Sequence, residues 1–250
     1  MTWKLIACLI SLWLGNPAAF AADSAPFEQA NRQFAAGDFK TAAATYQEVL
    51  RNHGPSAAVF YNLGNCYQRL GQYGPAILAY ERARLLSPRD PDLLANLRLA
   101  RKAAAALEEP RFDARLDAML NHFSRNEWSW LVAGAALLLG SIALIRGAVR
   151  PSVPWLRRAM LVAGGLCGLA IITGSTALYL RRGEDQHGVI LSEGATVRLS
   201  PFAKADVLGT PGPGRLVRMD HKRGEFRYIE VPGSNLQGWI PENEVAAINP

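Results

Sequence analysis

The sequence predicts a multidomain membrane protein that joins an α-solenoid of paired helices, a two-helix transmembrane hairpin and a small C-terminal β-barrel. Three observations carry this prediction. Residues 22–110 repeat with one fixed period, the runs Trp128–Ile145 and Ala159–Leu180 contain no charged residue, and residues 187–250 divide into short β-rich runs. A fixed period of about 20–50 residues is typical of stacked helical repeats, and long uncharged runs are typical of transmembrane helices.

The chain begins with the pattern of a secretory signal peptide over residues 1–21. Lys4 provides the positive start, Leu5–Leu14 the apolar centre and Ala19–Ala21 a small-residue cleavage site. An uncleaved membrane anchor is the alternative. Export by this segment would place the residues that follow it outside the cytoplasm.

Residues 22–110 read as two helical repeats, about 23–56 and 57–90, followed by a capping helix over 92–107. Small and aromatic residues recur about 34 positions apart, in the pairs Ala30 and Gly64, Gly37 and Gly71, Phe39 and Tyr73, Ala42 and Ala76, and Tyr46 and Tyr80. The second copy has the fuller pattern, with Phe60, Leu63, Gly64, Tyr67, Gly71, Tyr73, Ala76, Tyr80, Ala83 and Pro88. These positions resemble the tetratricopeptide signature, so the module is expected to be an α-solenoid of tetratricopeptide (TPR) repeats.

Two repeats and a cap are close to the lower limit of independent stability. We therefore expect this module to lean on a partner or on a membrane-proximal helix within residues 111–127. The apolar face of that helix would comprise Phe112, Leu116, Met119, Leu120 and Phe123.

The repeat resemblance also implies which residues line an inner groove. Counted from the repeat starts, five polar residues fall on the groove-facing side: Asn31, Tyr61, Asn65, Gln68 and Arg69. Asparagine can bond both the donor and the acceptor of an extended peptide backbone, and arginine can hold a carboxylate. A solvated helix face is the alternative to a peptide groove, and the sequence leaves both open.

The two uncharged runs are long enough to form transmembrane helices 128–145 and 159–180. At about 1.5 Å per residue they reach roughly 27 and 33 Å, which matches a hydrocarbon core of about 30 Å. Their lack of a polar stripe disfavours the alternative, a pair of buried core helices. The loop 146–158 carries only basic charges, so we expect it in the cytoplasm, with both flanking modules extracytoplasmic. The arginines at 181 and 182 oppose this orientation.

The net charge of +6 arises from arginines that flank these runs. Segment 111–182 has nine arginines against three acidic residues, so no basic face of a soluble domain suggests a nucleic-acid partner. Cys8, Cys66 and Cys167 fall in the leader, a repeat helix and a membrane run, which makes a disulfide framework implausible. The histidines form no metal motif, and no catalytic constellation, phosphate loop or cofactor motif is present. We expect a protein that is not an enzyme.

From His187 onward, short strands are expected at Gly188–Leu191, Thr196–Leu199, Val207–Leu208, Leu216–Met219, Phe226–Val231 and Trp239–Ile240. Such a segment suits a small closed barrel. The stretches Ala195–Pro201, Gly212–Gly214 before Leu216, and Gly238–Ile240 resemble a bacterial SH3-like domain. The resemblance permits binding of cell-wall peptide, although Trp239 is the kind of tryptophan that usually packs in the core.

The order of signal peptide, TPR module, membrane hairpin and SH3-like tail resembles the TPR protein of the bacterial Bat (aerotolerance) operon. The resemblance includes Asn126–Leu131 (NEWSWL) at the start of the first membrane run. It implies a scaffold in the cytoplasmic (inner) membrane that works with von Willebrand factor A-domain membrane proteins and a MoxR-type ATPase. The alternative is an envelope sensor whose tail binds cell-wall peptide, and a wall-targeted hydrolase is a third reading.

Overall fold

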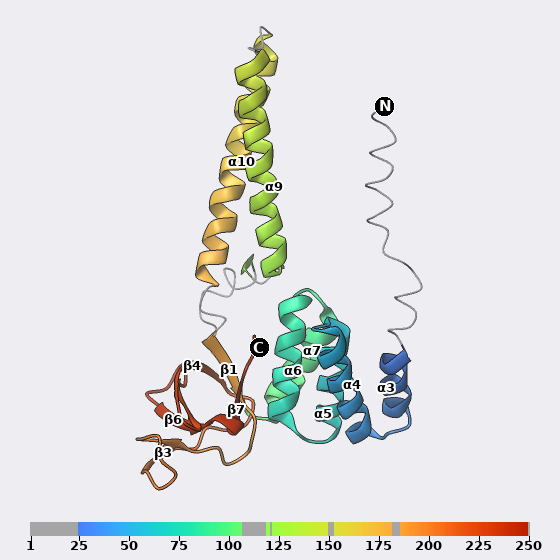
Figure 1. Cartoon of the computed structure of the whole chain (residues 1–250), viewed down its shortest axis with the longest axis vertical. Coiled ribbons are helices and arrows are strands. Elements are labelled where there is room, and N and C mark those ends of the chain that lie inside the picture. The colour runs from blue at the N-terminus through green and yellow to red at the C-terminus, as the bar shows by residue number, and fades with distance from the viewer. Residues whose placement is uncertain (1–24, 107–118, 121, 150–152, 182–185, 250) are drawn as a thin grey trace.

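The computed structural model describes residues 25–106, 119–120, 122–149, 153–181 and 186–249. The predicted signal peptide and most of the predicted membrane-proximal helix lie outside these residues. Within them, five helices form one module, two long helices form a hairpin that projects from it, and seven strands form a sheet beside it (Figure 1).

The five helices match the predicted repeats. Repeat one is α3 (Ala25–Ala35) and α4 (Phe39–His53), repeat two is α5 (Ala57–Arg69) and α6 (Tyr73–Leu86), and α7 (Pro91–Ala103) is the capping helix. The turn within each repeat contains a glycine with positive φ, Gly37 at 82° and Gly71 at 74°, a conformation that side chains with a Cβ rarely adopt. This requirement explains why glycine recurs at that position of the repeat.

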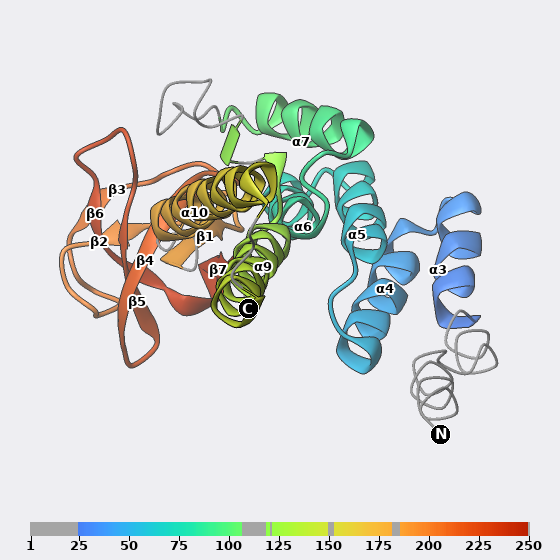
Figure 2. The same cartoon turned by 90° about the horizontal axis from the view of Figure 1, so that it is seen from above.

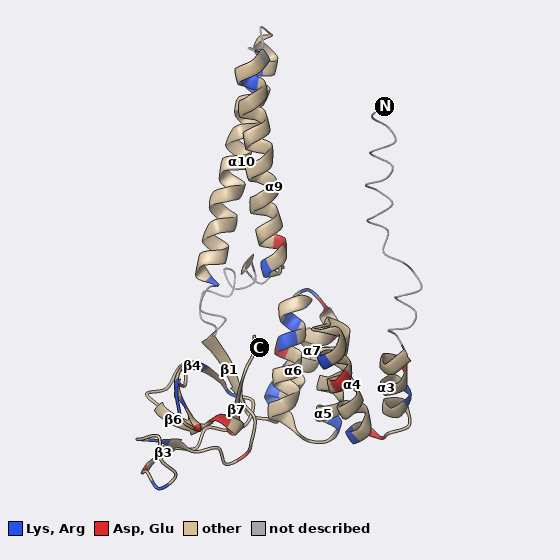
Figure 3. Cartoon of the chain, viewed as in Figure 1, with Lys and Arg blue, Asp and Glu red and all other residues tan. Residues whose placement is uncertain are grey.

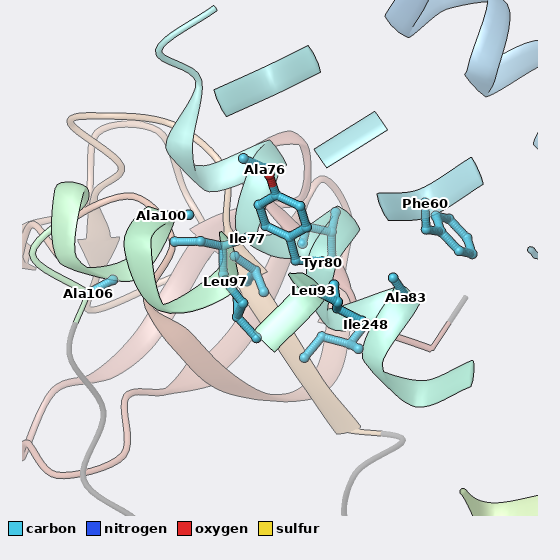
Figure 4. Close-up of a cluster of buried hydrophobic side chains, with 12 residues drawn as sticks. Phe60, Ala76, Ile77, Tyr80, Ala83, Leu93, Leu97, Ala100, Ala106 and Ile248 are labelled. Atoms are coloured by element: carbon cyan, nitrogen blue, oxygen red, sulfur yellow. The ribbon is translucent and has the colours of Figure 1, made fainter. Parts of the chain in front are cut away.

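Small residues let the paired helices approach closely, as the sequence suggested. Ala76 is fully buried, and a Cβ built on Gly64 would lie 2.5 Å from Cε1 of Tyr80. One cluster of buried side chains joins α3, α4 and α5, and a second joins α5, α6 and α7 around Tyr80 (Figure 4).

The two uncharged runs form the antiparallel helices α9 (Arg125–Val149) and α10 (Pro154–Leu180). α9 begins earlier than the uncharged run because Ser124 and Glu127 form a capping box: the Ser124 N–H donates to Glu127 Oε2 (2.8 Å) and the Glu127 N–H donates to Ser124 Oγ (3.2 Å). The helices pack through small residues, and a Cβ on Gly174 would lie 2.5 Å from Cγ2 of Val132. Only 6% of the apolar stretch of α9 and 17% of that of α10 are buried within the protein.

The C-terminal strands form one antiparallel sheet in the order β3-β2-β6-β5-β4-β1-β7. The strands are β1 (His187–Ile190), β2 (Val197–Arg198), β3 (Val207–Gly209), β4 (Leu216–Arg223), β5 (Phe226–Glu230), β6 (Gln237–Pro241) and β7 (Val245–Ala247). The sheet encloses a core that includes Val197, Val217, Ile229 and Ile240. Within residues 186–249 the ladders end at β3 and β7, so the sheet is open and the closed barrel stays a prediction.

The helical module and the sheet share one core, although the hairpin separates them in sequence. Val189 of β1 and Ile248, after β7, are buried in the same cluster as Ile77 of α6 (Figure 4). Arg82 of α6 donates hydrogen bonds to the carbonyl oxygens of Ala247 (2.8 Å) and Ile248 (3.3 Å). Among the described residues, the repeats therefore pack against the sheet of the same chain, which is neither the partner nor the membrane-proximal helix that the sequence led us to expect.

Candidate peptide groove

The first helices of the repeats and the capping helix line one side of the helical module. In Figure 2, α3, α5 and α7 follow one another along this side, and α4 and α6 lie behind them. The sheet meets the module mainly at α6. The side formed by α3, α5 and α7 is the predicted groove face.

A hydrogen-bonded group of three side chains, the first rung, connects repeat one to repeat two on this face. The Tyr46 hydroxyl donates to Asn31 Oδ1 (2.6 Å), and Asn62 Nδ2 donates to the same oxygen (3.3 Å). Asn31 lies on α3, Tyr46 on α4 and Asn62 on α5. One amide oxygen thus joins three helices.

A second rung repeats this arrangement between repeat two and the capping helix. The Tyr80 hydroxyl lies 2.7 Å from Asn65 Oδ1 and 2.7 Å from Gln68 Oε1. Asn96 Nδ2 donates to Asn65 Oδ1 (3.0 Å) and to the Tyr61 hydroxyl (3.0 Å). Each member of the first rung therefore recurs one repeat later, Asn31 as Asn65, Tyr46 as Tyr80 and Asn62 as Asn96.

The bonds within each rung determine what its asparagines can offer a ligand. An amide side chain has two acceptor sites on oxygen and two N–H donors. Asn31 and Asn65 use their oxygens twice and, among the described residues, donate from neither nitrogen. Asn62 and Asn96 donate from nitrogen, and no described residue donates to their oxygens. The half-buried asparagines of each rung therefore leave one amide nitrogen with unused N–H donors, on Asn31 or Asn65, and one amide oxygen with unused acceptor sites, on Asn62 or Asn96. These are the two kinds of group that can pair with the C=O and N–H of a peptide unit.

Burial keeps the rung phenols protonated, and so keeps them donors. Desolvation raises the pKa of Tyr46 to about 12, above its ordinary value of 10.0, and a nearby hydrogen bond from Asn62 opposes this weakly. Desolvation likewise raises the pKa of Tyr80. The hydrogen-bond pattern of the rungs is thus constant across the physiological pH range.

The structure brings four of the five predicted groove residues into the rungs and leaves one apart. Asn31, Asn65, Tyr61 and Gln68 take part in or contact a rung. The exposed Arg69 instead places its guanidinium 4.9 Å from the Phe39 ring centroid, at the end of α5. Whether these five residues bind a partner stays a prediction.

Sequence reasoning missed Asn62 and Asn96, although they lie one repeat apart. Glu28 occupies the position in repeat one that is equivalent to Asn62, so asparagine recurs at this position only once, at Asn96. Asn31 and Asn65 lie 34 residues apart, and the next position at that spacing is Leu99 on α7, which is 56% exposed. The groove face therefore ends on an apolar residue.

The thiol beneath the groove has no sign of reactivity. Cys66 is fully buried, and desolvation raises its pKa from 9.0 to about 11, which keeps it protonated. No group of three metal-binding side chains occurs among the described residues.

The sheet has an aromatic cluster of its own. His221 stacks on Tyr228 with ring centroids 5.3 Å apart, and both rings pack edge-on against Trp239. The Trp239 side chain is buried, as expected for a packing residue. This arrangement presents no open indole to a ligand.

Comparison with known protein families finds a recognised repeat in the helical module. A family model described as tetratricopeptide repeat matches residues 27–93, from α3 to the start of α7. The search of curated proteins finds no match to the chain. Residues 27–93 are therefore similar to tetratricopeptide repeats, a non-catalytic kind of repeat that suggests a role in protein–protein interaction.

Proposed function

We propose that this protein is a membrane-anchored, non-enzymatic scaffold that holds an extended segment of a partner protein in its TPR groove. The observation that carries the proposal is the pair of polar rungs. Each leaves an amide nitrogen with unused donors and an amide oxygen with unused acceptor sites on the groove face. An extended backbone has N–H and C=O groups at regular spacing, so it can satisfy both rungs without a particular side-chain sequence.

Membrane anchoring is supported by the surface of the hairpin. α9 and α10 contain 25 and 27 residues, or about 37 and 40 Å at the α-helical rise. Trp130 (77% exposed) and Tyr179 (67% exposed) lie toward the end near the globular part, and Trp155 (69% exposed) lies at the far end. Aromatic rings at two levels of an otherwise apolar, exposed surface match the two interfaces of a bilayer.

The topology we propose follows from the shared core. Because α6 packs on β1 and β7, the TPR module and the sheet must lie on the same side of any membrane that the hairpin crosses. The signal-peptide pattern of residues 1–21 makes that side the periplasm, and the cytoplasmic membrane the anchor. The arginine-bearing far end of the hairpin is then cytoplasmic.

The partner class that we propose follows from the domain order. Signal peptide, TPR repeats, membrane hairpin and an SH3-like tail resemble the Bat-type TPR protein, and this implies membrane proteins with von Willebrand A domains, coupled to a MoxR-type ATPase. A partner held in the same membrane could present an extended segment at the height of the groove.

Site-specific photo-crosslinking in intact membranes tests the function. A photoreactive residue at Leu99, on the groove face, is compared with one at Lys40, an exposed position on α4. We expect a discrete crosslinked membrane protein from position 99 only, and its loss when Asn31 and Asn65 are both replaced by leucine. Equal products from both positions, or a product at 99 that survives the double substitution, would contradict the groove function.

A further inference from the structure

The arginines at the two ends of the hairpin have different surroundings. At the end near the globular part, Arg181 is only 4% exposed and donates hydrogen bonds to the carbonyl oxygens of Phe123 (2.8 Å) and Leu120 (3.4 Å). Arg89 forms an ion pair with Glu127 across 2.6 Å. The protein itself satisfies these two guanidinium groups.

The arginines at the far end, the hairpin tip, have no such partners. Arg146 lies in the last turn of α9, and Arg157 and Arg158 lie near the start of α10; all three are exposed. The sequence has no acidic residue between Glu127 and Glu184, and within the described residues none of the three forms an ion pair. Figure 3 shows basic residues near the tip and uncharged helix surfaces below.

We propose that the hairpin tip binds the phosphate groups of anionic phospholipids in the leaflet that surrounds it. This inference rests on the membrane anchoring proposed above. Arg157 and Arg158 lie within about one helical turn, roughly 5 Å, of the uncharged run, which places their guanidinium groups at headgroup depth. Trp155, whose indole is exposed beside them, favours the same depth.

Lipid phosphate fits this surface better than a soluble anion. Guanidinium groups bind phosphate oxygens through paired N–H donors. The apolar surface that continues directly below the arginines requires acyl chains, and a phospholipid supplies the phosphate and the chains together. At the opposite end, Arg181 is buried against carbonyl oxygens, so its guanidinium group is not exposed to a lipid phosphate.

Lipid retention by the full-length protein tests this proposal. The protein is reconstituted into vesicles in which about one lipid in five is phosphatidylglycerol and the rest phosphatidylcholine, then extracted in mild detergent, and its bound lipids are quantified by mass spectrometry. Three proteins are compared. They are the unchanged chain, the tip variant Arg146→Gln/Arg157→Gln/Arg158→Gln, and a charge-matched control, Arg51→Gln/Arg98→Gln/Arg223→Gln, at exposed positions outside the hairpin.

We expect the unchanged chain and the control to retain phosphatidylglycerol and phosphatidylcholine in a ratio about tenfold above their ratio in the vesicle, and the tip variant to lose most of that enrichment. Equal enrichment in the tip variant, or none in the unchanged chain, would overturn the lipid site while leaving the scaffold intact. A protein that fails to insert into the vesicles at all would overturn the membrane anchoring and this inference together.

Discussion

Under the proposed function, Asn31 and Asn65 each have two roles on the groove face. Their oxygens accept hydrogen bonds from a buried tyrosine and from the asparagine of the next helix. Their nitrogens remain for a ligand. Substitutions at these positions therefore change stability and binding together, and an experiment on binding requires a stability measurement beside it.

Replacing Asn65 by leucine tests the structural role of the second rung. The change removes the oxygen that pairs with the Tyr80 hydroxyl and Asn96 Nδ2 and leaves these polar groups without that partner. We expect the free energy of unfolding to fall by about 1–3 kcal/mol, measured by urea denaturation in detergent. Asn52→Leu, at an exposed position of α4, is the matched control and should change stability little. Equal effects at the two positions would contradict the rung.

The variant Tyr46→Phe tests how the stability of the fold depends on alkaline pH. Burial raises the pKa of Tyr46 from 10.0 to about 12, so the folded protein keeps a proton that the unfolded chain releases. The stability that this provides is complete below pH 10.0 and is lost as the pH rises through about 12. Near neutral pH, the free energy of unfolding of the variant should be lower by about 1 kcal/mol, because the hydrogen bond to Asn31 is lost. Between these two pKa values its stability should decline less steeply than that of the unchanged chain. Parallel pH profiles from denaturation would refute this.

For single residues, the sequence predicted where a side chain lies better than which groups it contacts. The spacing of Asn31 and Asn65 placed both on the groove face, but the spacing cannot show that a tyrosine on the second helix of the repeat occupies their oxygens. Arg181 is the clearest case. By sequence it counted as an outward charge against the expected topology, and only the fold shows that it is buried against carbonyl oxygens.

Among the elements, the helices followed local patterns and were predicted well. The turn glycines, and Pro91 at the start of α7, each act within a few residues of the helix they define. β7 (Val245–Ala247) was missed because three small apolar residues carry no strand signal of their own. β7 forms because it pairs with the edge of β1 and because Arg82 of α6 donates a hydrogen bond to Ala247. Both contacts join segments that are distant in sequence.

The packing of α9 on α10 depends on one small residue. A Cβ at Gly174 would meet Val132 Cγ2 at 2.5 Å, whereas nothing lies within 4 Å of a Cβ built at Gly165. Gly174→Val should therefore push the helices apart and destabilise the hairpin by about 1–3 kcal/mol, while Gly165→Val should not. Thermal unfolding of the full-length protein in detergent, followed by light scattering, compares the two. Similar midpoints for both variants would show that the close contact at Gly174 contributes nothing.

At the scale of the whole molecule, the shared core indicates that residues 25–106 and 186–249 fold as one unit, which the hairpin of α9 and α10 interrupts in sequence. Two repeats and a cap bury too little surface to be robust alone. The sheet covers Ile77 of α6 and accepts hydrogen bonds from Arg82 at two carbonyl groups. No local pattern could have predicted this contact, because its two sides are separated by the hairpin.

Arg82→Ala tests this unity. The substitution leaves the carbonyl oxygens of Ala247 and Ile248 without their donor in a partly buried interface and should cost about 1–3 kcal/mol. Because the loss falls at the contact, hydrogen exchange should accelerate in β7 and β1 and also in α6, which lies far away in sequence. Arg98→Ala removes an equal charge from an exposed position of α7 and should leave all three elements protected. If exchange accelerated in β7 alone, the sheet and the repeats would be independent domains that merely touch. Under the proposed membrane anchoring, the groove face could then turn relative to the bilayer, and a partner in that bilayer would not meet it at a fixed height.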